Sequence, residues 1–513
     1  MSLLASNIFL SNTKVKGLIL LKHGLFTFAE TAKESYLAHI DAVNRAQRFI
    51  FAQPPKPLTF TRHKNCPHCT SELACKLFPV LRGIFHAKTK GTHWLLTYRP
   101  SPAALEFCNS DQVEDWSHRG TLTPDHVIRT KAFPLVLKSF EEHLESESKI
   151  REFLVQKVES YIQEYHDYFS RQNEKSEIKK TELDPIPRVI LVENLGLVTV
   201  GQTYSECTIA ADIYEHTIST IKDAMSVGSY EPVNETERFG MEYWSLEQAK
   251  LGKTQPPALG GRVVYITGAA SGIGLACAEV FGKMGANLVI VDIDSQNLET
   301  AAKKLKASKI PVHFLQADAT KFLEVQESFK KAVLQFGGVD ILISNAGKAF
   351  QSEMGNCSPE LFQQSLDINL LAHQHCASNA VSIMKPQKTG GCLLFNVSKA
   401  AVNPGKNFGP YAIAKAAELA LMKQYALEYA SFGIRSNAVN ADRVRTNIFS
   451  EDVIASRAKA RNLTPEEYFK SNLLQQEVTA QDVAQGFLFL AQATKTTAGT
   501  LTVDGGNLEA SLR

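Results

Sequence analysis

The chain has 513 residues, 44% of them hydrophobic, and a formal net charge of +2. This length predicts about three domains rather than one core. The near-neutral charge excludes nucleic acid or a membrane surface as the expected main partner, and no apolar run approaches the length of a membrane span. Nine scattered cysteines and a signal-free start at residues 1–22 predict a reduced, cytoplasmic protein.

The first 50 residues predict a strand, a turn at His23, a second strand and a helix from about Glu30 to Ile50. Residues 16–35 match residues 188–207 at a constant offset, and Leu195 takes the position of His23 in the second copy. This internal repeat indicates that the local structure does not require the histidine. The shared positions are Gly24/Gly196, Leu25/Leu197, Thr27/Thr199, Thr31/Thr203 and Glu34/Glu206.

Residues 53–135 lack clear periodicity, and we expect irregular structure there. This stretch contains a cysteine and histidine cluster that could bind zinc or act in redox chemistry, although a second Cys-x-x-Cys is missing. We therefore interpret the cluster as a reduced loop. Its members are His63, Cys66, His68, Cys69 and Cys75.

Two helical patterns follow. Asp125, His126 and Arg129 could form a polar site, but they equally fit a helix start with Thr123 as its cap. Residues 136–176 place apolar side chains at helical spacing among many charges, which predicts one long amphipathic helix.

A change in composition and hydrophobic periodicity near residue 250 indicates a domain boundary. Two prolines and several glycines place a linker at residues 252–257, between an N-terminal region (1–251) and a C-terminal domain (258–513). Strands and helices alternate beyond the linker, which predicts an α/β domain with a doubly wound parallel sheet.

The C-terminal domain opens with a dinucleotide-binding pattern. The strand Val263–Thr267 runs into Gly268, Gly272 and Gly274, and a helix and a second strand ending at Asp292 follow. Glycines let the backbone approach a pyrophosphate at a helix N-terminus, and the acid accepts hydrogen bonds from the ribose hydroxyls. No lysine or arginine lies in the glycine loop or directly after Asp292, so the sequence favours NAD over NADP.

Three polar residues downstream predict acid–base chemistry on a hydroxyl group. Tyr411 and Lys415 are four residues apart and share one face of a helix. The lysine ammonium favours the phenolate, which can take the hydroxyl proton, while Ser398 holds the substrate oxygen. Together with the segments TGAASGIG, Asn345-Ala346-Gly347 and YAIAK, this set resembles the short-chain dehydrogenase/reductase family.

This resemblance implies a Rossmann-type domain, a small-molecule substrate and a homo-dimer or tetramer. It also implies that Asn369 supports a water next to Lys415, which itself holds the nicotinamide ribose. Ala441-Asp442 stands where the family usually has Pro-Gly, and this departure could reshape the pocket. The resemblance places the cofactor against Gly268, Ser271, Gly272, Ile273, Gly274, Asp292, Asp318, Asn345, Ala346, Gly347, Tyr411, Lys415, Val444 and Thr446.

The N-terminal region resembles the late part of a class II aldolase/adducin-type domain, in which His23 would be one of three zinc ligands. The other two would come from an upstream His-x-His that this sequence does not contain, so we predict no metal site and a relic role for His23. Three further segments, TPDHVIRTK, MEYWSLEQAKLGK and NVSKAAVNPGKNFGPY, extend the likeness to bifunctional rhamnulose-1-phosphate aldolase/short-chain alcohol dehydrogenases.

The sequence thus predicts an NAD-dependent short-chain alcohol dehydrogenase with an incomplete aldolase-like region ahead of it. Its substrate would be a small alcohol or hydroxy-carbonyl compound, derived from lactaldehyde or a sugar. Two alternatives stay open: a zinc-dependent aldolase that needs a partner chain, and a non-catalytic NAD-binding protein.

Overall fold

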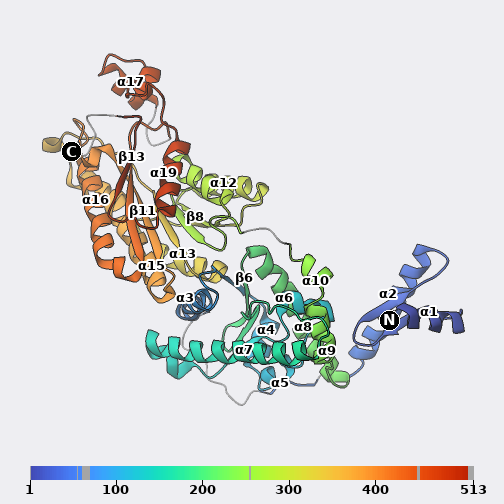
Figure 1. Ribbon diagram of the computed structural model, residues 1–513. Helices are drawn as coiled ribbons and strands as arrows, with labels where there is room; N and C mark the ends of the chain where they lie inside the picture. Colours follow the sequence, from blue (N-terminus) through green and yellow to red (C-terminus); the bar gives the residue numbers. More distant parts are fainter. Residues whose placement is uncertain (1, 55, 60–69, 253–255, 447–450, 507–513) are drawn as a thin grey trace.

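The computed structural model describes residues 2–54, 56–59, 70–252, 256–446 and 451–506. It consists of a small N-terminal unit, a region built on a four-stranded sheet and a region built on a seven-stranded sheet (Figure 1). None of the described helices is long and apolar enough to cross a membrane.

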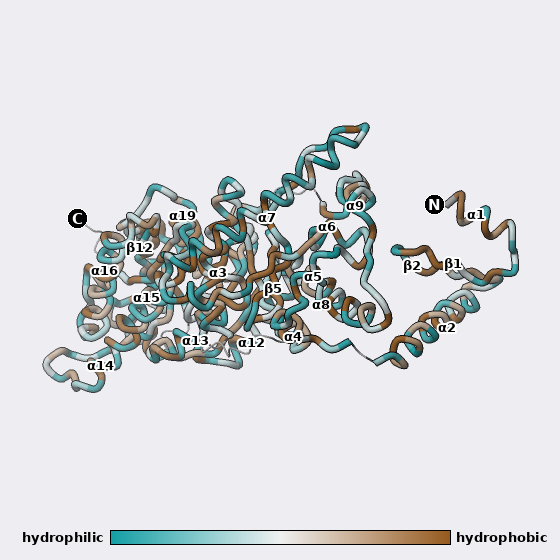
Figure 2. Tube along the Cα trace, turned by 90° about the horizontal axis from the view of Figure 1, so that it is seen from below, coloured by the Kyte–Doolittle hydropathy of each residue, from teal (hydrophilic) through white to brown (hydrophobic). Residues whose placement is uncertain are grey.

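The N-terminal unit is a helix, a hairpin and a second helix. Helix α1 (Ser2–Ser11) precedes the antiparallel strands β1 (Gly17–Leu20) and β2 (Gly24–Thr27), and α2 (Ala32–Phe51) follows. Thr31 and Glu34 form a capping box at the start of α2. None of the residues of α2 is buried, and the unit stands apart from the rest of the molecule in both views (Figures 1 and 2).

The second copy of the repeated sequence has the same local structure in a different environment. Strands β5 (Val189–Val192) and β6 (Gly196–Gly201) form the hairpin, and Thr203 and Glu206 cap helix α8 (Tyr204–Val227). Here every strand residue is buried. A threonine side chain ties hairpin to helix in both copies: Thr27 Oγ1 donates to Ser35 O at 2.9 Å, and Thr199 Oγ1 donates to Cys207 O at 2.8 Å.

This hairpin is the centre of the four-stranded sheet, which has the order β3-β6-β5-β4. Strand β3 (Leu95–Arg99) pairs antiparallel with β6, and β4 (Leu135–Leu137) pairs parallel with β5. The helices of this region are α3 (Thr70–Lys88), α4 (Pro102–Asn109), α5 (Val113–Ser117), α6 (Val127–Thr130), α7 (Glu147–Lys175), α8, α9 (Glu235–Glu242) and α10 (Ser245–Ala249).

Two expectations for this region are wrong. The long helix α7 begins at Glu147 rather than near residue 136, because Ser146 accepts a hydrogen bond from Lys149 N and caps it there; the preceding residues form β4 and a short 3-10 turn. The stretch 53–135 is not irregular throughout. It contains α3, in which all of residues 77–85 are buried, so the helix has no one-sided apolar pattern that would reveal its period; it also contains a proline, Pro79.

The seven-stranded sheet is parallel throughout, with the order β13-β12-β11-β10-β7-β8-β9. The strand order reverses between β7 and β10, so this is the doubly wound sheet that the sequence predicts. The strands are β7 (Val263–Thr267), β8 (Asn287–Asp292), β9 (Val312–Gln316), β10 (Ile341–Ser344), β11 (Gly391–Ser398), β12 (Ile434–Ala441) and β13 (Thr500–Val503).

Helices cover both faces of this sheet. One core forms beneath α11 (Gly272–Lys283), α12 (Ser295–Ala307) and α19 (Ala480–Gln492). The opposite core forms beneath α13 (Phe322–Phe336), α15 (Ala372–Gln387) and α16 (Gly409–Tyr429). This second core continues into α3, α7 and the hairpin β5–β6, so the two sheet regions share one hydrophobic interior.

Helix α3 makes the junction, because it packs against α13 and α15 (Figure 1). Arg82 at its centre is 1% exposed and forms an ion pair with Asp340, which is 2% exposed, at 2.9 Å. The same guanidinium donates to Trp94 O, Gly261 O and the Gln387 side chain. Burial opposes ionisation of Asp340, but Arg82 lowers the pKa of this carboxyl to about 2. A fully hydrogen-bonded charge pair therefore lies inside the junction.

Candidate active site

A cavity of about 740 Å³ opens at the carboxyl ends of the strands in the seven-stranded sheet. Its floor is the turn between β7 and α11. Gly268 and Gly272 have φ angles of +63° and +53°, which side chains disfavour, and a Cβ added at Gly274 would lie 2.1 Å from Gly268 O. The predicted fingerprint therefore forms a tight strand–turn–helix, with Ser271 at the N-cap and Ile273 in the first turn.

The acidic residues predicted for the cofactor lie along the same cavity. Asp292 ends β8, and its carboxylate accepts hydrogen bonds from Ala270 N and Asp294 N, both at 3.0 Å. Asp318 follows β9 and lines the cavity too. Asp292 is thus fixed beside the glycine turn, where the ribose of a bound dinucleotide would lie.

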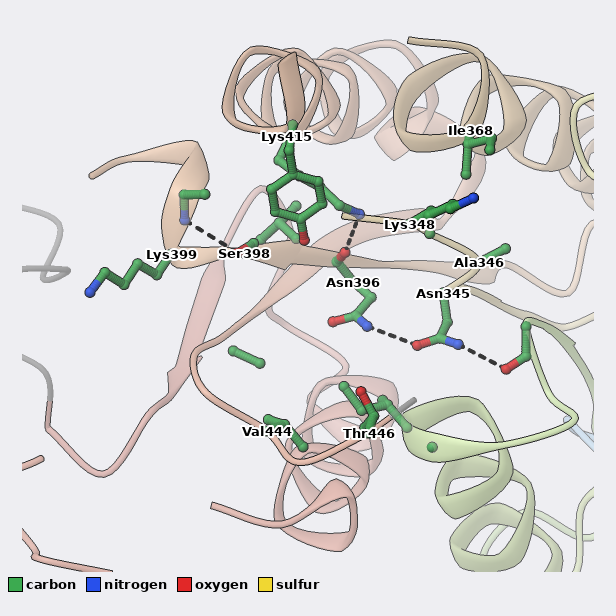
Figure 3. Close-up of a pocket in the computed structure, with 18 of the residues that line it drawn as sticks. Asn345, Ala346, Lys348, Ile368, Asn396, Ser398, Lys399, Lys415, Val444 and Thr446 are labelled. Carbon is green, nitrogen blue, oxygen red and sulfur yellow. Dashed lines mark hydrogen bonds between the residues drawn. The ribbon is translucent and has the colours of Figure 1, made fainter. Parts of the chain in front are cut away.

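Two asparagines join the turn to the centre of the sheet (Figure 3). Asn345 Nδ2 donates to Thr267 O at 3.0 Å and to Gly268 O at 3.1 Å, and Asn396 Nδ2 donates to Asn345 Oδ1 at 2.8 Å. Ala346 and Gly347 continue the lining. The sequence did not single out Asn396; its place two residues before Ser398 on the same strand was the available signal.

Ser398, Tyr411 and Lys415 line this same cavity. Figure 3 shows Ser398 and Lys415 in it. Ser398 ends β11, while Tyr411 and Lys415 lie on α16 with the lysine Nζ 6.0 Å from the centre of the tyrosine ring. Lys415 Nζ also donates to Asn396 O at 2.8 Å. The structure therefore places three of the four predicted catalytic residues along one cavity; the fourth is Asn369.

Asn369 lies behind this group and does not line the cavity. It belongs to a π-helical segment, Asp367–Leu371, between α14 (Pro359–Leu366) and α15, and it is fully buried. Its side chain accepts from Lys348 N at 3.0 Å and donates to Lys348 O at 2.9 Å. A Cβ added at Gly347 would lie 3.2 Å from Asn369 Oδ1 and 3.6 Å from Lys415 Nζ, so the asparagine is close to the lysine.

Sequence reasoning missed an acid beneath the lysine. Glu418 is fully buried, and its carboxylate accepts from Lys415 Nζ at 2.7 Å. His373 Nδ1 lies 3.3 Å from the other Glu418 oxygen and 2.7 Å from Ser344 Oγ. Burial raises the pKa of Glu418 to about 7, although Lys415 opposes this, and burial lowers the pKa of His373 well below its ordinary value. The spacing Lys415-x-x-Glu418 was the only signal.

The segment after β12 forms the opposite wall. Val444 and Thr446 line the cavity, and Thr446 Cγ2 lies 3.1 Å from the position of a Cβ at Gly272. Asp442, in the place of the glycine that the family usually has, lies between two cations: Lys399 Nζ at 3.6 Å and Arg443 Nε at 3.4 Å. The unusual turn therefore introduces a carboxylate into the cavity lining, where it pairs with Lys399, the residue after Ser398.

His23 is exposed on the turn between β1 and β2, with its ring stacked on Phe26. Within the described ranges, no group of three His, Cys, Asp or Glu residues could hold a metal ion. The predicted cluster His63, Cys66, His68 and Cys69 lies outside the described residues, and Cys75 belongs to α3.

The segment around Asp125 starts a short helical turn, as one of its two interpretations expects. Thr123 takes the N-cap position without a capping hydrogen bond and donates to the Asp125 side chain at 2.6 Å instead. His126 begins α6 at its N-cap, and Arg129 donates to Lys250 O at 3.3 Å.

A doubly wound sheet with a glycine turn at its switch point is typical of dinucleotide-binding oxidoreductases. Comparison with known proteins agrees: residues 72–251 match the family of the second domain of class II aldolase, and residues 268–507 match a family described as enoyl-(acyl carrier protein) reductase. The uncharacterized oxidoreductase YuxG of Bacillus subtilis is 31% identical over 512 residues, which cover 97% of this chain and 73% of that protein.

Other relatives match the C-terminal half. Dehydrogenase/reductase SDR family member 4 of Oryctolagus cuniculus is 31% identical over 216 residues, 42% of this chain and 82% of that protein. The crystal structure of levodione reductase is similar at 27% identity and a TM-score of 0.45, over 49% of this chain and 98% of that one. The chain belongs to the short-chain dehydrogenase/reductase family, with a class II aldolase region ahead of the dehydrogenase region. It is an oxidoreductase of a family that binds a nicotinamide cofactor.

Proposed function

We propose that the protein is an NAD-dependent alcohol dehydrogenase for a small alcohol or hydroxy-carbonyl compound, derived from lactaldehyde or a sugar. The observation that carries this proposal is the shared cavity: Ser398, Tyr411 and Lys415 line the same space as the glycine turn and Asp292. Bound NAD would supply the hydride acceptor. The proposal follows the chemistry that these side chains can perform on a hydroxyl group.

Tyr411 is the proposed general base. Its deprotonated oxygen takes the proton of the substrate alcohol and becomes a hydroxyl, and Ser398 Oγ hydrogen-bonds the substrate oxygen and fixes its orientation. The Lys415 ammonium lies on the next turn of α16, 6.0 Å from the centre of the tyrosine ring, where its positive charge attracts negative charge that develops on the tyrosine oxygen. Because Asn396 O and Glu418 hold the ammonium from below, the lysine stays beneath the tyrosine ring rather than swinging into solvent.

The choice of NAD rests on the adenosine end of the cavity. The Asp292 carboxylate is held by two backbone N–H groups, and it would repel the 2′-phosphate of NADP while accepting hydrogen bonds from ribose hydroxyls. Asn369 is the proposed support of a water near Lys415. We also propose, from the habit of the family, that the protein assembles as a dimer or tetramer, with residues 252–257 as the linker between its two regions.

The test is the rise of NADH absorbance with NAD and a panel of small 2-hydroxy aldehydes, diols and sugar alcohols, with Tyr411→Phe as the control. Tyr411→Phe removes the proton acceptor but leaves the ring in place, so we expect turnover to be lost while NAD still binds, as measured by quenching of intrinsic fluorescence. Loss of NAD binding together with turnover would contradict the proposed role. Full activity of the variant would contradict it as well.

A further inference from the structure

The end of the cavity beyond Tyr411 is rich in positive charge. It is covered by two helices, α17 (Glu451–Lys459) and α18 (Pro465–Lys470), which pack on each other through a small core of their own. Within the described part of the chain, the charged side chains that line this end are four cations and a single carboxylate: Lys399, Arg443, Arg457, Arg461 and Asp442.

The aromatic ring of Tyr468 lies close to three of these cations. Tyr468 of α18 has the Arg443, Arg457 and Arg461 guanidinium carbons at 5.1, 5.7 and 5.6 Å from its ring centre. Such stacking orients the plane of a guanidinium, and the N–H groups of a guanidinium can form planar, paired hydrogen bonds with an oxyanion. Three like charges around one ring repel one another, and an anion bound among them would relieve that repulsion.

The ring of Phe408 lies between this cluster of cations and Tyr411, the proposed proton acceptor. The Arg457 guanidinium lies 4.5 Å from the centre of the Phe408 ring, and the Phe408 ring contacts Tyr411 edge to face at 6.3 Å between centres. Arg457 is half-buried, so water is partly excluded around its guanidinium and a charged hydrogen bond there is strong. One aromatic ring therefore separates the reacting end of the cavity from its cationic end.

The carboxylate of Asp442 organises this cluster rather than cancelling it. It lies between Lys399, which follows Ser398 in the chain, and Arg443, which follows Asp442 itself. Arg443 is further fixed by donation to Ser471 O at 2.8 Å. Among the described residues that line this end of the cavity, the positive charges of Lys399, Arg443, Arg457 and Arg461 therefore outnumber the negative charge of Asp442.

We infer that the substrate carries a phosphate or carboxylate group, which Arg457 and Arg461 bind while the substrate hydroxyl lies at Ser398 and Tyr411. This inference rests on the proposed function for the position of the hydroxyl and adds the chemical class of the rest of the substrate. Hydroxy acids and phosphorylated polyols have this chemistry, whereas neutral diols do not.

The kinetic test uses two pairs of substrates, and in each pair an anionic group of one member replaces a neutral group of the other. The pairs are glycerol 3-phosphate with glycerol, and lactate with propane-1,2-diol. We expect kcat/KM to favour the anionic member of at least one pair by about tenfold or more at low salt, since charge-assisted hydrogen bonds are among the strong ones. The pair in which the anionic member is favoured shows whether the site takes a phosphate or a carboxylate. Equal kcat/KM within both pairs overturns the inference.

Variants assign the preference to residues. Arg457→Ala and Arg461→Ala should each reduce the anionic-to-neutral ratio of kcat/KM by about tenfold, mainly through KM, and Arg457→Lys should retain part of it. Lys459→Ala is the matched control, because it removes one exposed positive charge of α17 outside the cavity lining and should leave the ratio unchanged. A change in the KM for NAD instead of the KM for the second substrate would assign these cations to the cofactor and overturn the inference.

A binding measurement separates this inference from the proposed function. Titration calorimetry of the full chain with NAD present should detect binding of inorganic phosphate or acetate, weakened about tenfold or more in Arg457→Ala/Arg461→Ala. Anion binding that depends on these arginines, without NADH formation from any substrate, would refute the dehydrogenase but retain the anion site. NADH formation without anion binding would support the dehydrogenase and refute the anion site. NADH formation together with anion binding that the double variant leaves unchanged would have the same meaning.

Discussion

Replacement of Arg82 by methionine tests the charge pair inside the junction between the two sheet regions. The variant keeps most of the side-chain length but leaves Asp340 in an interior position, 2% exposed, without its counter-charge. The pKa of Asp340 lies at about 2 instead of 3.8, so the folded-state interactions of this carboxylate stabilise the protein by about 2 kcal/mol at neutral pH. Breaking a buried pair from one side costs about 3 to 5 kcal/mol, and we expect a loss in that range.

The assay is urea unfolding followed by tryptophan fluorescence, for which Trp94 is a reporter next to the arginine. Arg171→Met is the control, because Arg171 pairs with Glu235 at 3.2 Å on the surface, with 55% of its side chain exposed, and should cost less than about 1 kcal/mol. The stabilisation by Asp340 is present above pH 3.8 and is lost as the pH falls toward 2, so the gap between wild type and Arg82→Met should narrow in that window. A loss no larger than that of the control would refute the reasoning.

Three further substitutions test the cavity. Gly274→Ala places a Cβ 2.1 Å from Gly268 O, so we expect NAD affinity, measured by fluorescence titration, to fall by about tenfold or more, whereas Gly240→Ala, with open space at its Cβ, should bind normally. Asp292→Ala should relax the preference for NAD toward NADP in the ratio of kcat/KM; an unchanged ratio would mean that another group reads the ribose. Glu418 has a folded-state pKa of about 7 against 4.5, so its burial destabilises the protein increasingly as the pH rises from 4.5 to 7. Glu418→Gln also removes the partner of buried Lys415, which shifts stability by an amount that the linkage does not set. The pH trend is the test: urea unfolding should show wild type losing stability relative to Glu418→Gln as the pH rises across that window, and a constant difference would contradict the raised pKa.

The dehydrogenase fold was predictable because its signals are local. The strand before Gly268, the glycine spacing and the acid ending the next strand all lie within one continuous segment, and periodicity marks the elements around them. Ser398, Tyr411 and Lys415 were likewise visible from spacing along the chain. The cavity they share follows from the rule that parallel strands present their carboxyl ends at one edge.

The remaining features depend on contacts that sequence spacing does not encode. Arg82 and Asp340 are separated by more than 250 positions, and neither stands out in a sequence of ordinary charge content. Glu418 has an ionisable side chain, yet this side chain is buried. Its burial becomes apparent only where α15 and α16 meet, at the contact between His373 and Glu418. Asp442 was recognised as a departure, yet the cations that it holds became apparent only once the chain was folded.

The two copies of the hairpin and helix carry the same short-range interactions in opposite surroundings, one exposed and one enclosed by a sheet. Each closes within about twenty residues through a threonine side chain and a capping box, which are contacts of very low sequence separation. Contacts of this kind form early, before distant parts of a chain have met. Hydrogen exchange during refolding should therefore protect the amides of the β5–β6 hairpin ahead of those in β3 and β4, which means that the four-stranded sheet is assembled around a hairpin that already exists.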